Sequence, residues 1–299
     1  MRKRIAPGTT VALSEISFGC MSLAPDLSQN IRLIRSAYEG GINYFDTADL
    51  YEFGENEKRV GEAIKPFRKQ IFLATKVGNE PNKKREGWKW NPSKNYILRA
   101  VDKSLKRLQT DYIDLYQLHG GTLEDDKEEV IEAFEILKER GKILHYGLSS
   151  IRPNVIQYYA QHADLFSNML QYNMLDRRPE ESAFSTLADA HVGVLVRGAL
   201  AKGFMALKNK SISLDIDFKT IDLMKDKLIS FSTEKKVLVH LALQWVLRRS
   251  EVTSAVVGIR TEEQLNDILS YDSTAQLSNE ALENFTLDLP PIYYTKHRE

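Results

Sequence analysis

The sequence has one cysteine, no excess of charge of either sign and no long apolar run. The single cysteine, Cys20, excludes an internal disulfide framework and is typical of a reducing cytosol. Cysteine and histidine together are too few for a structural zinc site. Basic and acidic residues balance at 41 each, which gives no electrostatic footprint for nucleic acid or for an anionic membrane. No stretch approaches the ~20 apolar residues of a membrane helix. We therefore expect a cytoplasmic protein that holds no metal and binds neither nucleic acid nor membrane.

What the sequence does have is a repeated alternation of short apolar strands and helices. A small hairpin is predicted over residues 4–13, around Pro7-Gly8, and about eight strand–helix units follow it. The predicted strands span residues 16–19, 42–45, 71–76, 112–119, 143–149, 166–171, 192–196 and 254–257. The predicted helices span residues 30–39, 56–66, 127–140, 235–249 and 261–269, with others that end at Leu108, follow Pro153 and precede His191.

This alternation predicts the fold. Most of the strands lack an alternating polar pattern, so they are expected to be buried on both faces in a parallel sheet. Eight units in 299 residues, with no linker between them, predict a single (β/α)8 barrel domain over residues 1–299. The N-terminal hairpin and extra helices after strand seven and at the C-terminus are additions to it. A doubly wound sheet is disfavoured, because Gly19-Cys20-Met21-Ser22 is not a glycine-rich dinucleotide fingerprint.

Four ionisable side chains belong to the ends of three consecutive predicted strands. Asp46, Lys76 and His119 stand at the strand ends, and Tyr51 lies in the loop after Asp46. Each has a structural alternative: Asp46 as a turn cap, Tyr51 as a rim cover, Lys76 as a rim charge, His119 as a core histidine. In a barrel, however, chemistry lies at the carboxyl ends of the strands. Taken together, these four residues, called here the polar cluster, predict a catalytic site.

The polar cluster also makes chemical sense. An unperturbed tyrosine has a pKa near ~10, and a nearby Lys76 cation is expected to lower the pKa of Tyr51. Asp46 supplies the counter-ion that a buried lysine needs. His119 can donate a hydrogen bond that orients a carbonyl oxygen beside the phenol. The result is a proton donor aimed at a carbonyl group, which implies hydride delivery from a nicotinamide.

Several motifs, in order and at suitable spacing, resemble the aldo-keto reductase family along nearly the whole chain. They are Gly41-Ile-Asn-Tyr-Phe-Asp-Thr-Ala-Asp-Leu-Tyr51, residues 54–61, Ala74-Thr75-Lys76, Ser104-Leu-Lys-Arg-Leu108, Asp111-Tyr-Ile-Asp-Leu115, Leu118-His119, Gly147-Leu-Ser149, Gln171-Tyr-Asn173 and Gly258-Ile-Arg260. The resemblance implies that the polar cluster is a catalytic tetrad and that NADP(H) carries the hydride. It implies Tyr51 as general acid in reduction and as general base in oxidation.

The resemblance also implies which residues bind the cofactor. Ser149 and Gln171 match positions that hold the nicotinamide amide, and Leu200 and Gly203 match a pyrophosphate loop. The complete implied set is Gly19, Met21, Asp46, Ser149, Gln171, Arg197, Gly198, Leu200, Lys202, Gly203, Gly258, Arg260 and Gln264.

The chain departs from the family pattern at two informative places. Arg197 replaces the aromatic residue expected to stack on the nicotinamide; a guanidinium can also stack on a ring, and the alternative is a pyrophosphate or carboxylate contact. Ile268 stands where an adenine-contacting asparagine is common. Arg260 and Gln264 lie where the family grips the 2′-phosphate of NADP, a role that suits arginine at a helix N-terminus. The alternative for Arg260 is a surface charge paired with Glu263.

Substrate contacts are harder to predict. Leu50 and Trp88, with Tyr51 and His119, are expected to contact a small carbonyl or sugar substrate. Trp88 and its neighbour Trp90 could instead pack down the long polar segment 78–95. The short tail after residue 289 is expected to leave the site open, which favours broad specificity.

Three functions are compatible with these residues. The first is NADPH-dependent reduction of aldehydes or ketones to alcohols. The second is a sugar or polyol dehydrogenase that runs mainly toward oxidation with the same catalytic residues. The third is a nucleotide-sensing regulatory subunit with slow turnover, which no large basic or apolar extension favours.

Overall fold

The computed structural model describes residues 1–207, 216–272 and 277–296, and its centre is a closed parallel barrel. The eight barrel strands follow one another around the sheet in chain order, and the last pairs with the first. They are β3 (Ile16–Gly19), β4 (Tyr44–Asp46), β5 (Phe72–Val77), β8 (Ile113–Leu118), β9 (Ile143–Leu148), β10 (Ser167–Gln171), β11 (Gly193–Arg197) and β12 (Val252–Gly258). The predicted (β/α)8 barrel is therefore confirmed.

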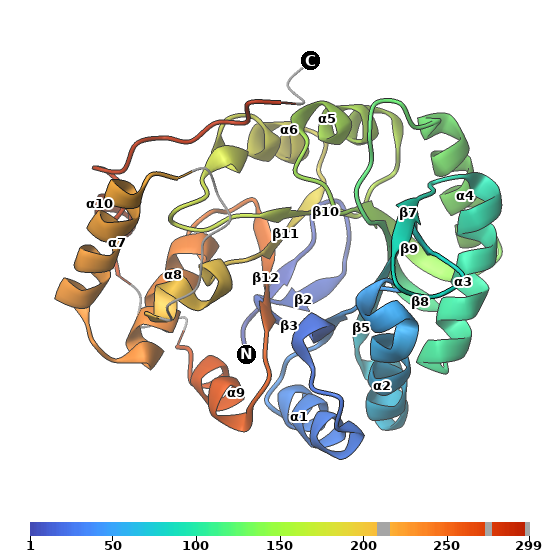
Figure 1. Cartoon of the computed structure of the whole chain (residues 1–299), viewed down its shortest axis with the longest axis horizontal. Helices are drawn as coiled ribbons and strands as arrows, with labels where there is room; N and C mark the ends of the chain where they lie inside the picture. Colours follow the sequence, from blue (N-terminus) through green and yellow to red (C-terminus); the bar gives the residue numbers. More distant parts are fainter. Residues whose placement is uncertain (208–215, 273–276, 297–299) are drawn as a thin grey trace.

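Helices form a ring outside the strands (Figure 1). They are α1 (Leu27–Glu39), α2 (Glu55–Ile64), α3 (Lys94–Leu108), α4 (Lys127–Glu139), α5 (Pro153–His162), α6 (Ala183–Asp189), α8 (Lys235–Leu247) and α9 (Glu262–Leu269). Short 3₁₀ helices span Cys20–Ser22, Tyr51–Gly54, Lys65–Gln70, Arg178–Glu180 and Ala201–Ala206. Side-chain caps define several helix starts: Asp26 accepts from Gln29 N before α1, and Asp126 accepts from Glu129 N before α4.

The predicted hairpin closes the amino end of the barrel. Its strands are β1 (Lys3–Ile5) and β2 (Ala12–Ser14). The Arg4 guanidinium donates to the carbonyl oxygens of Leu247 and Val252, at 2.6 and 2.8 Å, where α8 ends and β12 begins. The hairpin therefore ties the start of the chain to its last barrel strand, and it leaves the carboxyl end of the barrel as the mouth.

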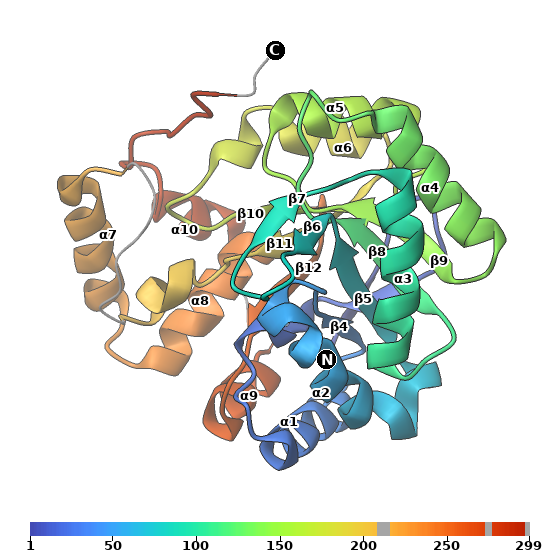
Figure 2. The ribbon, with the colours of Figure 1, turned by 45° about the vertical axis from the view of Figure 1, so that its right-hand side comes forward.

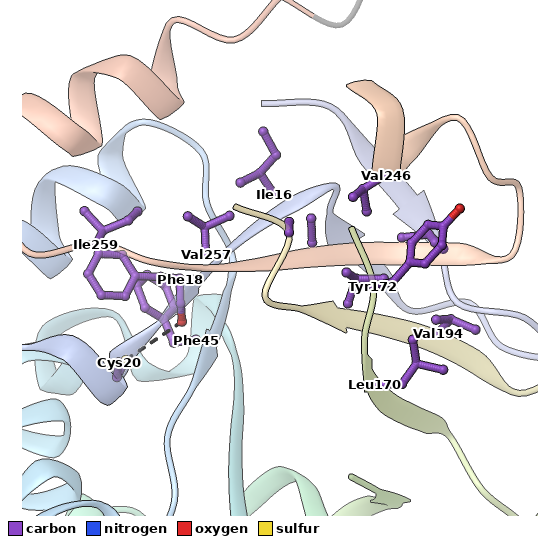
Figure 3. Packing of buried hydrophobic residues seen from close by; sticks show 14 of the residues in the cluster. Ile16, Phe18, Cys20, Phe45, Leu170, Tyr172, Val194, Val246, Val257 and Ile259 are labelled. Carbon is purple, nitrogen blue, oxygen red and sulfur yellow. Dashed lines mark hydrogen bonds between the residues drawn. The ribbon is translucent and has the colours of Figure 1, made fainter. Parts of the chain in front are cut away.

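Two hydrophobic layers fill the structure, so the barrel is a packed core rather than a pore. Inside it, Tyr44 and Phe166 pack on either side of Phe72, with ring centroids 5.8 and 5.2 Å away. Between strands and helices, Phe18 stacks on Phe45 at 5.8 Å, as Figure 3 shows beside Val257 and Ile259. Full burial of one such side chain contributes about 1.5–3 kcal/mol. These two layers leave no open channel along the barrel axis among the described residues, and one cavity of the structure lies at the mouth.

Three elements differ from or refine the sequence prediction. The segment predicted as polar contains a second hairpin, β6 (Asn79–Pro81) and β7 (Trp88–Trp90), which lies in front of the barrel strands in Figure 2. The region after β11 contains α7 (Phe218–Phe231) before α8. A C-terminal helix, α10 (Asn279–Asn284), lies beside α7, where Phe231 and Phe285 meet edge to face at 5.2 Å. Among the described residues, no helix is long and apolar enough to cross a membrane.

Candidate active site

The polar cluster assembles at the barrel mouth from three neighbouring strands. Asp46 is the last residue of β4, and Lys76 is the penultimate residue of β5, which pairs with β4 in parallel. His119 follows β8 directly, and its backbone N–H donates to Val77 O at 2.7 Å. Tyr51 begins the 3₁₀ turn that leads from β4 into α2. Because parallel strands end at one rim, the four side chains meet there.

At the centre of the cluster is a buried ion pair. The Lys76 ammonium donates to Asp46 Oδ1, to Thr47 O at 2.7 Å and to Tyr51 Oη at 3.4 Å. Lys76 is 1% exposed and Asp46 3% exposed. Burial alone lowers the pKa of Lys76, but Asp46 and Tyr51 outweigh it and leave the pKa raised. The lysine is therefore a cation with all three donors occupied, which is how buried charges are tolerated.

The second oxygen of Asp46 is held by two residues that the sequence prediction missed. Tyr44 Oη donates to Asp46 Oδ2 at 3.2 Å, and Gln117 Nε2 donates to the same oxygen at 3.1 Å. Both side chains are fully buried; Tyr44 belongs to β4, and Gln117 is the penultimate residue of β8. They fix the orientation of the carboxylate, and through it the position of the Lys76 ammonium.

The Tyr51 phenol lies between the lysine and the histidine. Lys76 Nζ is 5.1 Å from its ring centroid, and the His119 ring meets it edge to face at 6.0 Å. Burial raises the pKa of Tyr51 more than Lys76 lowers it, so the net shift is upward. Lys76 does lower the pKa of Tyr51, as expected, but the cost of ionising a buried phenol is larger. The hydroxyl is accordingly protonated at neutral pH, as a proton donor must be.

His119 is neutral in this environment. Burial, with the Lys76 and Arg197 cations nearby, lowers its pKa to about 3. Its Nδ1 is buried and has no hydrogen-bond partner among the described residues. A neutral imidazole carries one N–H donor and one acceptor nitrogen. His119 can therefore orient a carbonyl oxygen by hydrogen bonding, but it is not an acid at physiological pH.

The residues expected at the nicotinamide amide lie further round the same rim, at the ends of β9–β11. Ser149 follows β9, and Gln171 ends β10. Gln171 Nε2 donates to Asp176 at 2.8 Å, while its Oε1 accepts from Arg197 at 2.9 Å. The Arg197 side chain is open to water yet lies in a concave site, where desolvation lowers its pKa. A carboxamide that bound to Gln171 would have to compete with Asp176 or Arg197 for its hydrogen bonds.

The predicted pyrophosphate loop has the backbone of a tight turn after β11. Gly198, Lys202 and Gly203 all have positive φ, at 72, 57 and 96°. Glycine adopts this left-handed region without strain, and Lys202 is exposed beside it. Leu200 is half-buried and accepts a backbone hydrogen bond from Gly203 at 2.7 Å. A turn of this kind exposes backbone N–H groups, which suits an anion.

The third group of cofactor candidates lies at the ends of β3 and β12. Gly19 and Gly258 are paired across these strands, next to the exposed Met21. A Cβ on Gly258 would lie 2.6 Å from Ser22 Oγ, so a larger residue there would force the Ser22 side chain to move. The Arg260 backbone N–H donates to Gln264 Oε1 at 2.9 Å at the start of α9, while its side chain extends into solvent. The two glycines leave these strand ends without side chains, which would let an extended group lie close to the backbone there.

The predicted substrate contacts are only partly assembled. Leu50 is half-buried next to Tyr51, but Trp88 is 53% exposed on the β6–β7 hairpin. Trp90 packs the hairpin down: its ring lies over Gly78 and Gly120, and its Nε1 donates to Asp125 at 2.8 Å. The packing alternative is thus the one that describes Trp90.

The tail does not leave the site open, contrary to expectation. Tyr294 is 5% exposed, lies under the Arg178 guanidinium at 4.9 Å, and donates its backbone N–H to Glu181 at 3.4 Å. With Thr295 and Lys296 it forms one wall of a cavity at the mouth. Residues 297–299 of the tail lie outside the described residues. In the described part of the chain, no three His, Cys, Asp or Glu side chains gather as a metal site.

Comparison with known proteins agrees with this geometry. The model of the aldo/keto reductase family matches residues 15–286. The chain belongs to this family, whose members are oxidoreductases that act on carbonyl compounds with a nicotinamide cofactor.

Three relatives show how far the likeness extends. A solved structure, the holo form of aldo-keto reductase AKR11C1 from Bacillus halodurans, superimposes with a TM-score of 0.92, at 42% identity over 100% of both chains. The uncharacterized oxidoreductase YqkF of Bacillus subtilis is 41% identical over 100% of both chains. The NADH-specific methylglyoxal reductase of Escherichia coli is 29% identical, over 89% of this chain and 92% of its own.

Proposed function

We propose that this protein reduces aldehydes or ketones to alcohols with NADPH, and that Tyr51 is the general acid. The observation that carries the proposal is the protonated phenol of Tyr51, 3.4 Å from a buried lysine cation and edge-on to a neutral imidazole. No nucleophile is needed for this chemistry, because the nicotinamide supplies a hydride when it is bound. The chain itself has to place the carbonyl group and supply the proton.

Each member of the polar cluster has a distinct part in this proposal. His119 and Tyr51 hold the carbonyl oxygen, and Tyr51 Oη transfers its proton to that oxygen as negative charge develops. The Lys76 cation then stabilises the phenolate that remains. Asp46 keeps Lys76 charged and in place, so it acts as a positioning residue. Tyr51 regains its proton from solvent once the product leaves.

The preference for NADPH is proposed from Arg260. Arg260 is exposed two residues before the start of α9, where a 2′-phosphate would gain a bidentate partner and the helix dipole. Two acidic residues, Glu262 and Glu263, share that turn and oppose a phosphate. One relative carries NADH specificity in its name, so the two nucleotides have to be compared directly. We also propose that residues 1–299 form one catalytic domain and that the protein is cytoplasmic.

Replacing Tyr51 by phenylalanine tests the proposal. We expect kcat for aldehyde reduction, read from the absorbance of NADPH, to fall by about 100- to 10,000-fold, because this is the usual contribution of a general acid. NADPH binding, followed by fluorescence titration, should stay nearly unchanged. Tyr112→Phe is the matched control: it removes the same hydroxyl at the amino end of β8, where the ring contacts Arg68. Wild-type turnover by the Tyr51 variant would show that the proton comes from elsewhere.

A further inference from the structure

A cavity of about 360 Å³ opens at the barrel mouth beside the polar cluster. Its walls come from five separate parts of the chain: the loops after β8 and β9, the 3₁₀ turn after β10, the end of β11 and the C-terminal tail. The lining residues are Gly120, Ser149, Ser150, Ile151, Arg152, Arg178, Arg197, Tyr294, Thr295 and Lys296. The volume suits a small molecule of about ten to fifteen non-hydrogen atoms, given that binding pockets run from ~300 Å³ upward.

The charge of this cavity is one-sided. Four of its lining residues are cationic, and none of the described lining residues is acidic. One cation is already balanced: Arg178 makes a bidentate contact with the buried Asp176, at 2.8 and 2.7 Å. Arg152, Arg197 and Lys296 have no carboxylate within ion-pair distance among the described residues. An uncompensated group of cations in a concave site raises the local concentration of anions.

Two hydrogen bonds hold Arg152 in place at the cavity wall. One of its guanidinium nitrogens donates to the carbonyl oxygen of Gly121, and its backbone N–H donates to Ser150 Oγ at 3.2 Å. It is also the residue that precedes α5, so the positive end of that helix dipole adds to its charge. A guanidinium fixed by one hydrogen bond loses less side-chain entropy when it pairs with an anion.

The cavity lies next to the reacting groups. Gly120, in its wall, follows His119 in the chain. Arg197, in the same wall, is close enough to lower the pKa of both Tyr51 and His119. Tyr51 and His119 are not among the residues that line the cavity, so a bound molecule would have to extend past Gly120 or Arg197 to bring its carbonyl group to them.

We infer that the preferred substrate is a small carbonyl compound that carries an anionic group, a carboxylate or a phosphate, a few bonds from its carbonyl. The anion contacts Arg152 and Lys296 while the carbonyl oxygen faces Tyr51 and His119. This inference rests on the proposed reductase function and names the substrate class for it. It differs from the expectation of an open, unselective site, because the tail brings Lys296 into the wall.

Arg152 lies far from Arg260, the residue proposed to bind the 2′-phosphate of the cofactor. Arg152 follows β9, whereas Arg260 follows β12, three strands further round the barrel. Adjacent strands are ~4.8 Å apart, so the two sites are separated by roughly 14 Å along the rim. Only Ser149 and Arg197 belong to both the cavity and the expected nicotinamide contacts.

The experiment compares charged and neutral substrates of similar size in two arms. The carboxylate arm sets succinic semialdehyde against butanal, and the phosphate arm sets glyceraldehyde 3-phosphate against glyceraldehyde. We expect kcat/KM to be at least roughly tenfold higher for the charged member of one or both pairs, since a charge-assisted hydrogen bond is worth about that factor. The advantage should shrink as salt is raised. The arm with the larger ratio identifies the anionic group.

Two variants locate the effect. Arg152→Gln keeps a donor for Gly121 O but removes the charge, and Lys296→Met removes the other cation. Each should lower the charged-to-neutral ratio about tenfold and leave the neutral aldehyde unchanged. Lys235→Met, an exposed residue at the start of α8, is the control. A second readout is binding: malonate or inorganic phosphate should raise the melting temperature of the NADPH-bound wild type, and less so that of Arg152→Gln.

The outcomes separate the inference from the proposed function. Equal kcat/KM for charged and neutral partners, insensitive to salt, would overturn the inference and leave the reductase intact. No turnover of any of the four aldehydes would count against the reductase itself. If Arg152→Gln weakened NADPH binding and left the charged-to-neutral ratio unchanged, the cations would serve the cofactor and the inference would be wrong.

Discussion

The Asp46–Lys76 pair allows one prediction to be worked out in detail. Asp46→Asn keeps the size and shape of the side chain and removes its charge. Tyr44 and Gln117 can still bond an amide oxygen, at their present 3.2 and 3.1 Å. Lys76, 1% exposed, loses the only carboxylate that pairs with it among the described residues, and it keeps Thr47 O as its remaining strong acceptor.

The expected loss of stability is large. Breaking a buried ion pair by removing one partner costs about 3–5 kcal/mol, because the other charge is left uncompensated. Double substitution, Asp46→Asn with Lys76→Met, should recover most of that loss, since a buried apolar side chain needs no counter-ion. The double-mutant cycle isolates the interaction between the two residues from the effect of each change alone.

The pH dependence gives a second signature with a definite sign. In the wild type the pKa of Lys76 is raised, so its contribution is complete below the unfolded pKa of about 10.4 and is lost at higher pH. In Asp46→Asn, burial is no longer opposed, and the pKa of Lys76 falls below the unfolded value. The unfolded chain then binds more protons than the folded one, so the stability of the variant rises with pH up to about 10.4.

Urea denaturation at several pH values, followed by far-ultraviolet circular dichroism, measures both effects. The gap between wild type and Asp46→Asn should be widest near neutral pH and should narrow toward pH ~10. A loss below about 1 kcal/mol at neutral pH, with no change of the gap with pH, would refute the reasoning. It would mean that water or another group compensates Lys76.

Two further predictions concern the cofactor and acid stability. Arg260→Ala should weaken NADPH binding by roughly tenfold or more and NADH binding little, because only NADPH has a 2′-phosphate to lose its partner; fluorescence titration measures both, and an equal loss would exclude that role. His119, with a folded pKa of about 3 against about 6.5 unfolded, contributes stability that is complete above pH ~6.5 and is lost as the pH falls toward ~3. At pH 5 this loss is about 1–2 kcal/mol, and His119→Gln should remove that part of the acid sensitivity in urea titrations; an unchanged pH profile would contradict it.

The barrel could be predicted from the sequence because its signals are local. Eight short apolar runs alternate with amphipathic helices, and each run stops at a polar residue or a glycine. The β6–β7 hairpin was missed because each strand has only three residues, which is too short for a recognisable pattern. β6 is polar, β7 is largely exposed, and the packing of Trp90 helps to hold the hairpin in place. Helix α7 left a usable signal: Asp217 caps it, and Ile221, Met224 and Leu228 follow at helical spacing.

The polar cluster was predicted in outline, but not its environment. The predicted strand ends place Asp46, Lys76 and His119 on one rim of the barrel. Which side chains contact them from inside the barrel depends on the pairing register of the strands. The hydroxyl of Tyr44 reaches Asp46 only because β4 and its neighbours turn these side chains into the barrel interior. The sign of the Tyr51 shift depends on burial, which no local pattern gives. The course of the tail depends on long-range contacts such as Tyr294 with Arg178.

The contact between the hairpin and the last barrel strand has a consequence for how the chain folds. Arg4 bonds carbonyl groups that lie 243 and 248 residues further along the chain, and β3 pairs with β12, the last strand of the barrel. During synthesis, the first strands thus leave the ribosome long before their partners exist. Contacts this distant in sequence slow folding and keep edges unpaired meanwhile. We therefore expect closure of the barrel, which needs β12 up to residue 258, to be a late step in folding.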